Sequence, residues 1–265
     1  MSNQTQGTAL ITGASTGIGA IYADRLARRG YDLILVARSK DKLDALASRV
    51  AADTGRKVEV VVADLVQTDD LARVEQVIAT TNDLAVLVNN AGVGAGRTFM
   101  EADLGDMTRM IALNVTAATR LAHKAAERMV PRGNGTVINI ASIVAIAPEL
   151  LNAVYGGSKA YMLTLSQAMH HELADKGIRV QAVLPGATAT EFWPASGMAV
   201  EQLDASWVMS AADMVDASLA GLDAGELVTL PAVEDQGLVD ALESARRALF
   251  GELSKSRPAS RYHVA

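Results

Sequence analysis

Tyr155 and Lys159 are the residues whose types and spacing most directly indicate chemistry in this sequence. They lie four positions apart in VYGGSKAYM, residues 154–162, among small and apolar residues. On a helix this spacing places both side chains on one face, where the ammonium group favours the phenolate form of the tyrosine. Such a pair can accept and donate a proton. The alternative is a tyrosine beside a lysine on an exposed helix surface. The surrounding sequence has to distinguish between these two interpretations.

Gly156 and Gly157 separate the two residues and favour the first interpretation. Each glycine in a helix costs about 1 kcal/mol relative to alanine, so a purely structural helix has little reason to carry both. Here they would leave room for a ligand against the helix. A free tyrosine has a pKa of about 10. It therefore needs a lowered pKa to act as a base near neutral pH.

The elements that must position this pair follow a regular alternation. Seven short runs are nearly continuous in apolar character, which is typical of strands covered by helices on both faces of a parallel sheet. These runs are 8–14, 32–38, 57–64, 84–92, 136–142, 179–186 and 226–231. Helical patterns lie between them, two of them long, at 103–130 and 153–176. The alternation predicts an α/β fold, a Rossmann-type doubly wound sheet of about seven parallel strands.

No linker, repeat or low-complexity tract interrupts the alternation, so residues 1–265 are predicted to form a single domain for coenzyme binding and catalysis. Within it we expect a substrate-binding lid at about 188–212 and a polar C-terminal tail at about 252–265.

A glycine-rich turn, TGASTGIG at 12–19, connects the first run to the first helical pattern. Glycines let the backbone turn tightly and approach a pyrophosphate, and the helix start behind them offers free N–H groups. A glycine-rich motif is weak evidence by itself, and the strand–turn–helix context makes it stronger evidence for a phosphate-binding turn. It makes six loop residues candidates for coenzyme contacts: Gly13, Ser15, Thr16, Gly17, Ile18 and Gly19. A second glycine-rich loop, 92–96, is expected to form a wall of the same cleft.

The second run ends at Arg38 and Ser39, where the adenosine ribose should lie. A carboxylate there would bind the ribose 2′-hydroxyl, whereas a cation accommodates a 2′-phosphate. Arginine suits phosphate because of its planar fork of donors. The sequence therefore favours NADP(H) over NAD(H), against the alternative of an exposed arginine with no ligand.

Two polar residues precede or accompany the Tyr/Lys pair. Ser142 ends the fifth run, where ligands bind in open α/β sheets, and its hydroxyl can hydrogen-bond a carbonyl oxygen or an alcohol. Alone, it would be interpreted as a strand-end cap. Asn114 lies in IALNVTAAT, inside a helical pattern in which asparagine is mildly unfavourable. Its alternative is a buried amide bonded to the backbone.

Composition excludes several functional classes. Thirty acidic and 24 basic residues give a net charge of −6, which argues against nucleic acid as a partner. There is no cysteine, so thiolate catalysis and thiolate-held zinc are excluded. The four histidines lack metal-ligand spacing, and no metal site is predicted; they are His123, His170, His171 and His263. No apolar run is long enough for a membrane span and no signal peptide fits, so we expect a cytoplasmic protein.

With TGASTGIG, NNAG at 89–92, Asn114, Ser142 and Tyr155-x-x-x-Lys159 in this order, the chain resembles the short-chain dehydrogenase/reductase family. The likeness is to its short single-domain branch and runs from about residue 8 to Thr190. It implies that Tyr155 is the catalytic acid/base and that Ser142 polarises the substrate carbonyl. It further implies that Lys159 holds the nicotinamide ribose and lowers the tyrosine pKa, and that Asn114 supports a water-linked proton relay.

The resemblance also implies coenzyme contacts beyond the glycine-rich turn. Asp64 and Leu65 would flank the adenine, and Asn90, Ala91 and Gly92 would line the central part of the coenzyme. In the segment after the sixth run, the implied residues are Pro185, Gly186, Thr188 and Thr190, with the two threonines meeting the carboxamide and phosphates. Thr16 stands where NADP-using relatives often carry a basic residue, so the NADP(H) prediction rests mainly on Arg38.

Together these features predict an NADP(H)-dependent oxidoreductase that interconverts a carbonyl and an alcohol on a small to medium, moderately hydrophobic substrate. The apolar residues expected near the substrate are Val93, Ile143, Leu150, Leu151, Phe192, Trp193, Met198, Trp207 and Met209. Simple packing of a short lid helix explains several of these equally well. The rival hypothesis is a non-catalytic NADP(H)-binding regulatory or scaffold protein. The resemblance implies a homodimer or homotetramer, built through the two long helical segments.

Overall fold

The computed structural model describes residues 5–94, 96–195 and 203–263. The chain forms two compact units, one spanning 1–231 and the other 232–265, and each is described by itself. Every residue predicted to act in the site belongs to the first unit.

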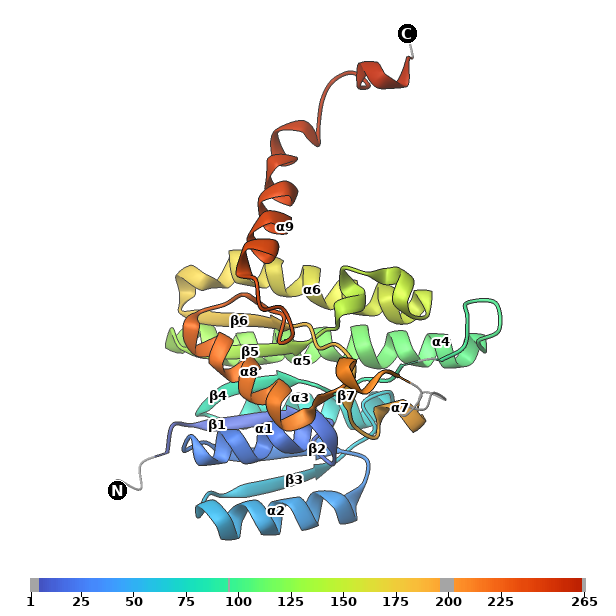
Figure 1. Cartoon of the computed structure of the whole chain (residues 1–265). Coiled ribbons are helices and arrows are strands. Elements are labelled where there is room, and N and C mark those ends of the chain that lie inside the picture. The colour runs from blue at the N-terminus through green and yellow to red at the C-terminus, as the bar shows by residue number, and fades with distance from the viewer. Residues whose placement is uncertain (1–4, 95, 196–202, 264–265) are drawn as a thin grey trace. The chain divides into compact units, whose positions relative to one another are not determined.

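The first unit is built on a parallel sheet (Figure 1). Its strands run in the order β3-β2-β1-β4-β5-β6-β9, so the chain starts in the middle, builds outward to one edge and then crosses to the other. The strands are β1 (Thr8–Thr12), β2 (Asp32–Ala37), β3 (Val58–Val62), β4 (Leu84–Asn89), β5 (Gly135–Ile140), β6 (Ile178–Val183) and β9 (Val228–Thr229). All neighbouring pairs are parallel. The predicted doubly wound sheet of seven strands is confirmed.

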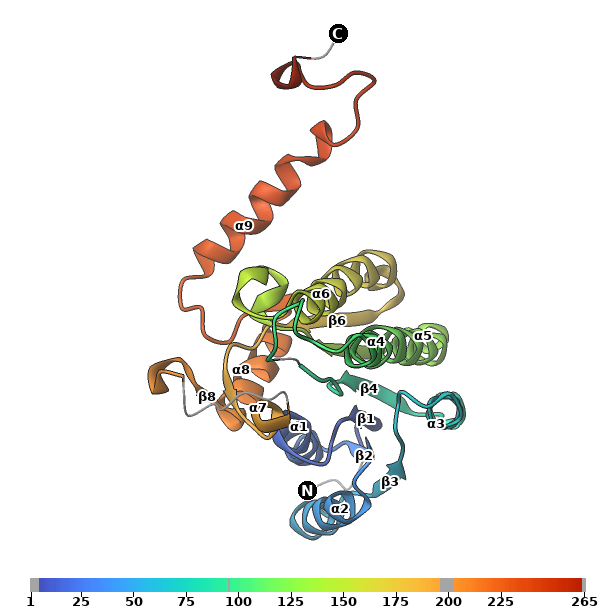
Figure 2. The same cartoon turned by 90° about the vertical axis from the view of Figure 1, so that its right-hand side faces the viewer.

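Helices cover both faces of this sheet, as Figure 2 shows from one end. One face carries α1 (Gly17–Arg28), α2 (Lys40–Thr54) and α8 (Ala211–Ala224). The other carries α3 (Thr68–Thr80), α5 (Ala118–Met129) and α6 (Ala153–Leu173). Each layer of helices has its own apolar core against the sheet. The inner strands are therefore buried on both faces, which explains why their sequences are mostly apolar rather than alternating, whereas the edge strand β3 is partly exposed.

The long helical segment predicted at 103–130 is divided into three parts. It begins with α4 (Leu104–Ile111), continues as a π-helix over Ala112–Ala117 and ends with α5. Single turns of π-helix are frequent at functional sites, and this one contains Asn114. The second predicted segment, 153–176, is α6 followed by a short 3₁₀ turn.

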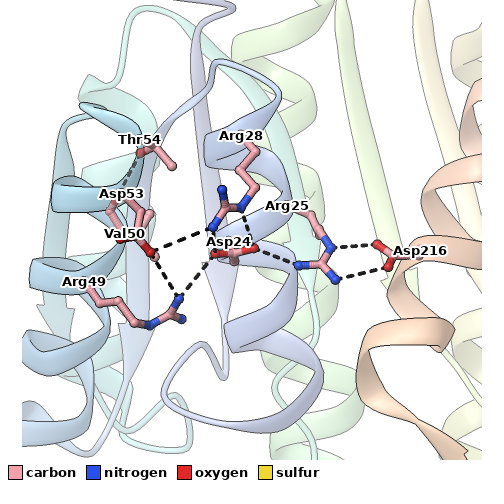
Figure 3. A network of polar contacts seen from close by, with 8 residues as sticks. All are labelled: Asp24, Arg25, Arg28, Arg49, Val50, Asp53, Thr54 and Asp216. Carbon is pink, nitrogen blue, oxygen red and sulfur yellow. Dashed lines mark hydrogen bonds and ion pairs between the residues drawn. The ribbon is translucent and has the colours of Figure 1, made fainter.

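A buried carboxylate ties α1 to the helices beside it (Figure 3). Asp24 accepts hydrogen bonds from Arg25 at 2.8 Å, Arg28 at 3.0 Å and Arg49 of α2 at 3.3 Å. Arg25 also pairs with Asp216 of α8 at 2.7 Å. Burial alone would raise the pKa of Asp24, but the hydrogen bonds from Arg28 and Arg25 hold it below its ordinary range. This network fixes the helix that follows the glycine-rich turn.

In the segment predicted as a lid, the structure describes residues 188–195 and 203–212, and within these ranges the regular elements are short. Its strands β7 (Thr188–Ala189) and β8 (Met209–Ser210) pair in parallel, and α7 spans Phe192–Ala195. Met198, predicted to lie near the substrate, falls outside the described residues. Glu191 pairs with Lys42 of α2 at 2.8 Å, which links this segment to the helix that follows strand β2.

The second unit consists of α9 (Gln236–Ala248) and two short 3₁₀ turns. Four leucines of this unit, two in α9 and two just after it, are half or more exposed: Leu238, Leu242, Leu249 and Leu253. A lone helix of this length is marginal in water, so exposed apolar side chains of this kind are unusual. Over residues 5–94, 96–195 and 203–263, no helix is long and apolar enough to cross a membrane.

Candidate active site

The predicted site residues gather where the parallel strands end. The glycine-rich turn follows β1, Arg38 follows β2, Asp64 follows β3 and Asn90 follows β4. Ser142 follows β5 in the same way. Because the strands are parallel, their carboxyl ends meet at one edge of the sheet, the edge at which open α/β sheets bind ligands.

The turn after β1 has the backbone that its glycines were predicted to supply. Gly13 and Gly17 have φ angles of 64° and 55°, a region that side chains disfavour. A Cβ atom on Gly13 would also lie 2.8 Å from the amide nitrogen of Asn90, and one on Gly17 would lie 3.1 Å from Thr190. The turn is thus pressed against the loops after β4 and β6, and only glycine fits at both positions.

Thr12 and Asn90 hold this turn in place. The Asn90 side chain donates to the carbonyl oxygens of Thr12 at 2.9 Å and Gly13 at 3.1 Å. The Thr12 hydroxyl accepts the backbone N–H groups of Asn90 and Ala91, both at 3.0 Å. Sequence reasoning named Asn90 as a coenzyme contact but missed the positioning role of Thr12. Its place at the last position of a buried strand, beside a glycine turn, was the available signal.

Two hydroxyl groups stand at the starts of the helices that follow β1 and β2. Thr16 is the N-cap of α1 and Ser39 is the N-cap of α2, yet neither side chain makes a capping hydrogen bond. Thr16 is partly buried and Ser39 is exposed. Both stand at helix N-termini, where unpaired N–H groups and the helix dipole favour an anion.

Arg38 is exposed at the end of β2 and makes no hydrogen bond or ion pair with any residue that the structure describes. Its neighbour Lys40 is already paired with Asp44. A free guanidinium group here fits a ribose 2′-phosphate, and the described residues of this turn offer no carboxylate in its place. The contact between Arg38 and a 2′-phosphate stays a prediction.

Asp64 and Leu65, predicted to flank an adenine, have partners of their own. Asp64 accepts a hydrogen bond from Arg109 of α4 at 2.9 Å and one from the backbone N–H of Val66 at 3.2 Å. Leu65 is buried in the apolar core behind the sheet edge. The segment is therefore fixed in place, and its contact with an adenine stays a prediction.

Tyr155, Lys159 and Ser142 are brought together at the edge formed by β4 and β5. Lys159 is buried, donates to the backbone oxygen of Ile140 at 2.8 Å and lies 5.7 Å from the centre of the Tyr155 ring. Tyr155 and Ser142 are also buried, and their side chains hydrogen-bond each other. The tyrosine and lysine are therefore not surface residues, and the first of the two initial interpretations fits the geometry.

The pKa values of this pair differ from the sequence expectation. Burial raises the pKa of Tyr155 to about 12, and the hydrogen bond with Ser142 lowers it by a smaller amount. Burial lowers the pKa of Lys159 to about 8. In the protein alone, desolvation of both charged forms outweighs the attraction of an ammonium for a phenolate. The expected lowering of the tyrosine pKa by Lys159 is absent here.

Asn114 connects the π-helix to the rest of the site. Its amide group exchanges two hydrogen bonds with the backbone of Val93, at 3.0 and 2.9 Å, and donates to Ser158 at 3.1 Å. Ser158 in turn donates to the carbonyl oxygen of Tyr155 at 2.8 Å. The Asn114 side-chain oxygen and the Lys159 nitrogen both lie against Gly92. They are 3.2 and 3.5 Å from the position that a Cβ atom on Gly92 would take. Asn114 therefore braces the loop after β4 against α6.

The two glycines of the opening motif have different surroundings. Gly156 is buried, and a Cβ there would lie 3.7 Å from Pro148. Gly157 is exposed and a Cβ there would meet nothing within 4 Å. Gly157 therefore faces away from the Tyr155 and Lys159 side of the helix, and it does not make room for a ligand beside them.

The segment after β6 reaches both the glycine-rich turn and the buried pair. The carbonyl oxygen of Pro185 accepts the backbone N–H of Ile143 at 3.1 Å and holds the Ser142 segment in place. The Thr188 hydroxyl donates to the carbonyl oxygen of Gly186 at 3.1 Å. Thr190 lies against Gly17. All four residues predicted in this segment thus line the same edge of the sheet.

The chain belongs to the short-chain dehydrogenase/reductase family, since the family model described as short chain dehydrogenase matches residues 7–199. The "very-long-chain 3-oxoacyl-CoA reductase" of Anas platyrhynchos is 33% identical over 187 residues, which cover 69% of this chain and 60% of that protein. The chain thus spans about 60% of the length of the curated relatives it matches.

Two solved structures match nearly the whole chain. A short-chain dehydrogenase from Sphingobium yanoikuyae in complex with NADPH is 46% identical, with a TM-score of 0.93, and covers 97% of this chain and 99% of its own. The bulky-bulky ketone specific alcohol dehydrogenase from Comamonas testosteroni is 43% identical, with a TM-score of 0.89, and the match covers 98% and 99%. These two likenesses extend the family match over nearly the whole chain.

Proposed function

We propose that this protein is an NADPH-dependent carbonyl reductase that also runs in reverse as an alcohol dehydrogenase. The observation that carries the proposal is the buried meeting of Tyr155, Lys159 and Ser142 at the end of the sheet next to a glycine turn. The free guanidinium of Arg38 supports NADP(H) as the coenzyme, and so does the NADPH in the Sphingobium structure. All of these residues lie in the first unit, and we infer that this unit alone forms the coenzyme-binding and catalytic domain.

The residues present fit such a coenzyme. Gly13 and Gly17 leave the space for a pyrophosphate, the start of α1 offers N–H groups to it, and Arg38 would bind the 2′-phosphate. Asn90, Ala91 and Gly92 would line its central part, with Thr188 and Thr190 on the other side. When bound, the nicotinamide supplies or accepts the hydride.

The chain's own residues manage the proton. In the reducing direction, the Tyr155 hydroxyl donates its proton to the carbonyl oxygen of the substrate as that oxygen gains negative charge. The Ser142 hydroxyl donates a hydrogen bond to the same oxygen and so stabilises the developing charge. With a pKa near 12, the phenol is fully protonated at neutral pH, which suits a proton donor. The Lys159 amine, held by the Ile140 carbonyl, lies close enough to bias the phenol electrostatically.

For the substrate we propose ketones with sizeable apolar groups. Buried Met110 and Val144 pack around Tyr155, and the partly buried Val93, Leu151 and Phe192 pack against them. These side chains offer apolar contacts and no charge to a group bound beside the tyrosine. The likeness to an alcohol dehydrogenase described as specific for bulky-bulky ketones supports the same class.

The direct test is oxidation of NADPH and of NADH, followed by absorbance, with a panel of aryl and alkyl ketones. We expect turnover with NADPH in the wild type and a loss of at least a thousandfold in Tyr155→Phe, with the Kd for NADPH unchanged within threefold. Phenylalanine keeps the ring and its packing but removes the donated proton. If Tyr155→Phe turns over at the wild-type rate, the proton-transfer role is refuted. Tight NADPH binding without turnover of any ketone would instead favour the non-catalytic hypothesis.

We also propose that the protein is a homodimer or homotetramer, and that the exposed leucines of the second unit take part in the subunit interface. Leu238, Leu242, Leu249 and Leu253 are half or more exposed, and covering a single leucine side chain contributes about 1.5–3 kcal/mol. Size-exclusion chromatography with light scattering of the full chain measures the assembly. A monomer at micromolar concentration would contradict the proposal.

A further inference from the structure

Phe192 lies between the loop after β4 and the catalytic tyrosine. Its ring centre is 5.8 Å from that of Tyr155, with the ring planes tilted by 44°. The other end of the ring points at Gly94. A Cβ atom built on Gly94 would lie 3.0 and 3.1 Å from the Cε2 and Cε1 atoms of Phe192, and closer still to Cζ at the tip. The ring therefore fills the space that a side chain at position 94 would need.

The backbone of Gly94 does not itself require glycine. Its φ angle lies outside the left-handed region, in contrast to Gly13 and Gly17 in the turn after β1. The three atoms nearest to a Cβ at Gly94 all belong to the ring of Phe192. The nearest obstacle to an alanine at this position would thus be that ring.

The ring of Phe192 is fixed from its own segment as well. Trp193 packs edge-on against it, with ring centres 5.7 Å apart and planes at 89°. The Trp193 indole is buried and donates to the carbonyl oxygen of Thr188 at 2.8 Å. The backbone N–H of Phe192 is bonded to the hydroxyl of Thr190 at 3.3 Å. An aromatic ring held in this way has one position rather than many.

We propose that Phe192 is a specificity-determining residue that limits the size of one substituent of the carbonyl substrate. We further propose that Gly94 is its seat, the position whose missing side chain leaves room for the ring. This rests on the proposed function above. A carbonyl oxygen bonded to Tyr155 brings its carbon, and the two groups on that carbon, next to the tyrosine ring. Phe192 is only partly buried and lies against that ring, so one of the two groups meets it.

The first arm of the test removes the ring. In Phe192→Ala we expect the ratio of kcat/KM for valerophenone to that for acetophenone, both with NADPH, to rise at least tenfold. One methylene in an apolar site changes selectivity by about 10- to 200-fold, and removing a phenyl ring opens space for several. Phe250→Ala removes the same side chain from the second unit and should leave the ratio unchanged. An unchanged ratio in Phe192→Ala refutes the proposal.

The second arm tests the seat. In the wild-type background, Gly94→Ala pushes the ring towards Tyr155, and we expect kcat/KM for acetophenone to fall at least tenfold. In the Phe192→Ala background the methyl group has room, and the same change should cost less than threefold. This double-mutant cycle measures the coupling between the two positions. Equal losses in both backgrounds would show that Gly94 serves another purpose and would overturn its assignment as the seat.

The controls separate this proposal from the proposed function. The Kd for NADPH and the thermal midpoint are measured for each variant, so that a folding or coenzyme defect is recognised. If the wild type reduces no ketone, the proposed function has failed. If the wild type reduces acetophenone and Phe192→Ala has the same valerophenone-to-acetophenone ratio of kcat/KM as the wild type, only the assignment of Phe192 has failed.

Discussion

Replacing Arg38 with leucine should remove most of the preference for NADPH over NADH. The Arg38 side chain is exposed at the end of β2 and has no partner among the described residues, so its removal breaks no contact within the protein. Leucine keeps the aliphatic stem out to Cδ and removes the guanidinium group with its charge and its donors. The fold and the binding of the rest of the coenzyme should therefore be unaffected.

The size of the effect follows from the exposure of the guanidinium group. A hydrogen bond to a charged group contributes about 1.5–3 kcal/mol to binding, and solvent screening at an exposed site favours the lower part of that range. A loss of about 1.5–2 kcal/mol raises the Kd for NADPH about 10- to 30-fold. The Kd for NADH, which lacks the 2′-phosphate, should change less than twofold.

Fluorescence titration of each variant with NADPH and with NADH gives the two Kd values at fixed salt. Arg73→Leu is a matched control, because Arg73 is also a half-exposed arginine but is already bonded to Asp70 and to the carbonyl oxygen of Val62. It should leave both values unchanged. If Arg38→Leu weakens NADH as much as NADPH, or weakens neither, the assignment of the 2′-phosphate to Arg38 is wrong.

Two further predictions concern buried ionisable groups. Asp24→Asn should lower stability by about 2 kcal/mol, through the loss of charge-assisted hydrogen bonds, and the thermal midpoint by about 4–8 °C. Because the pKa of Asp24 is depressed in the folded protein, its stabilisation is present at neutral pH and is lost as the pH falls below about 4, so calorimetry should find the two midpoints converging there. We expect Lys159 to titrate near pH 8, well below exposed lysines. NMR measures this as the pH dependence of its ¹³Cε chemical shift, with Lys159→Met used to assign the signal. A midpoint near pH 10 would show that the amine reaches solvent.

The strands and the site edge were predictable from the sequence because both depend on local rules. Apolar runs bounded by glycine and polar residues predict the seven strands to within a few positions, since a strand buried on both faces tolerates little else. The order of strands in a doubly wound sheet then places Ser142, Tyr155 and Asn90 at one edge. Tyr155 and Lys159 share a helix, so their common face followed from spacing alone.

The failures of prediction arise where an outcome depends on surroundings that the sequence does not localise. The π-helix at Ala112–Ala117 interrupts a pattern that is helical on both sides, because Asn114 bonds to Val93 in a loop distant in the sequence. Spacing predicts that Lys159 approaches Tyr155 but not that both are buried. Burial reverses the direction in which the pKa of Tyr155 shifts. Removing the phenolate from water disfavours it more than the nearby ammonium group of Lys159 favours it.

The contact between Gly94 and Phe192 is of the same kind. The sequence predicts Phe192 near the substrate and Gly94 in a loop that forms a wall of the cleft, yet neither sequence neighbourhood indicates that one fills the space of the other. A glycine in a GVGAG loop is readily explained by backbone flexibility, and only the φ angle at Gly94 removes that explanation. Once it is removed, the missing side chain has to be explained by what lies beside it. The residue beside it is an aromatic ring packed against Tyr155, the proposed proton donor, which is why we assign Gly94 to substrate selectivity rather than to loop conformation.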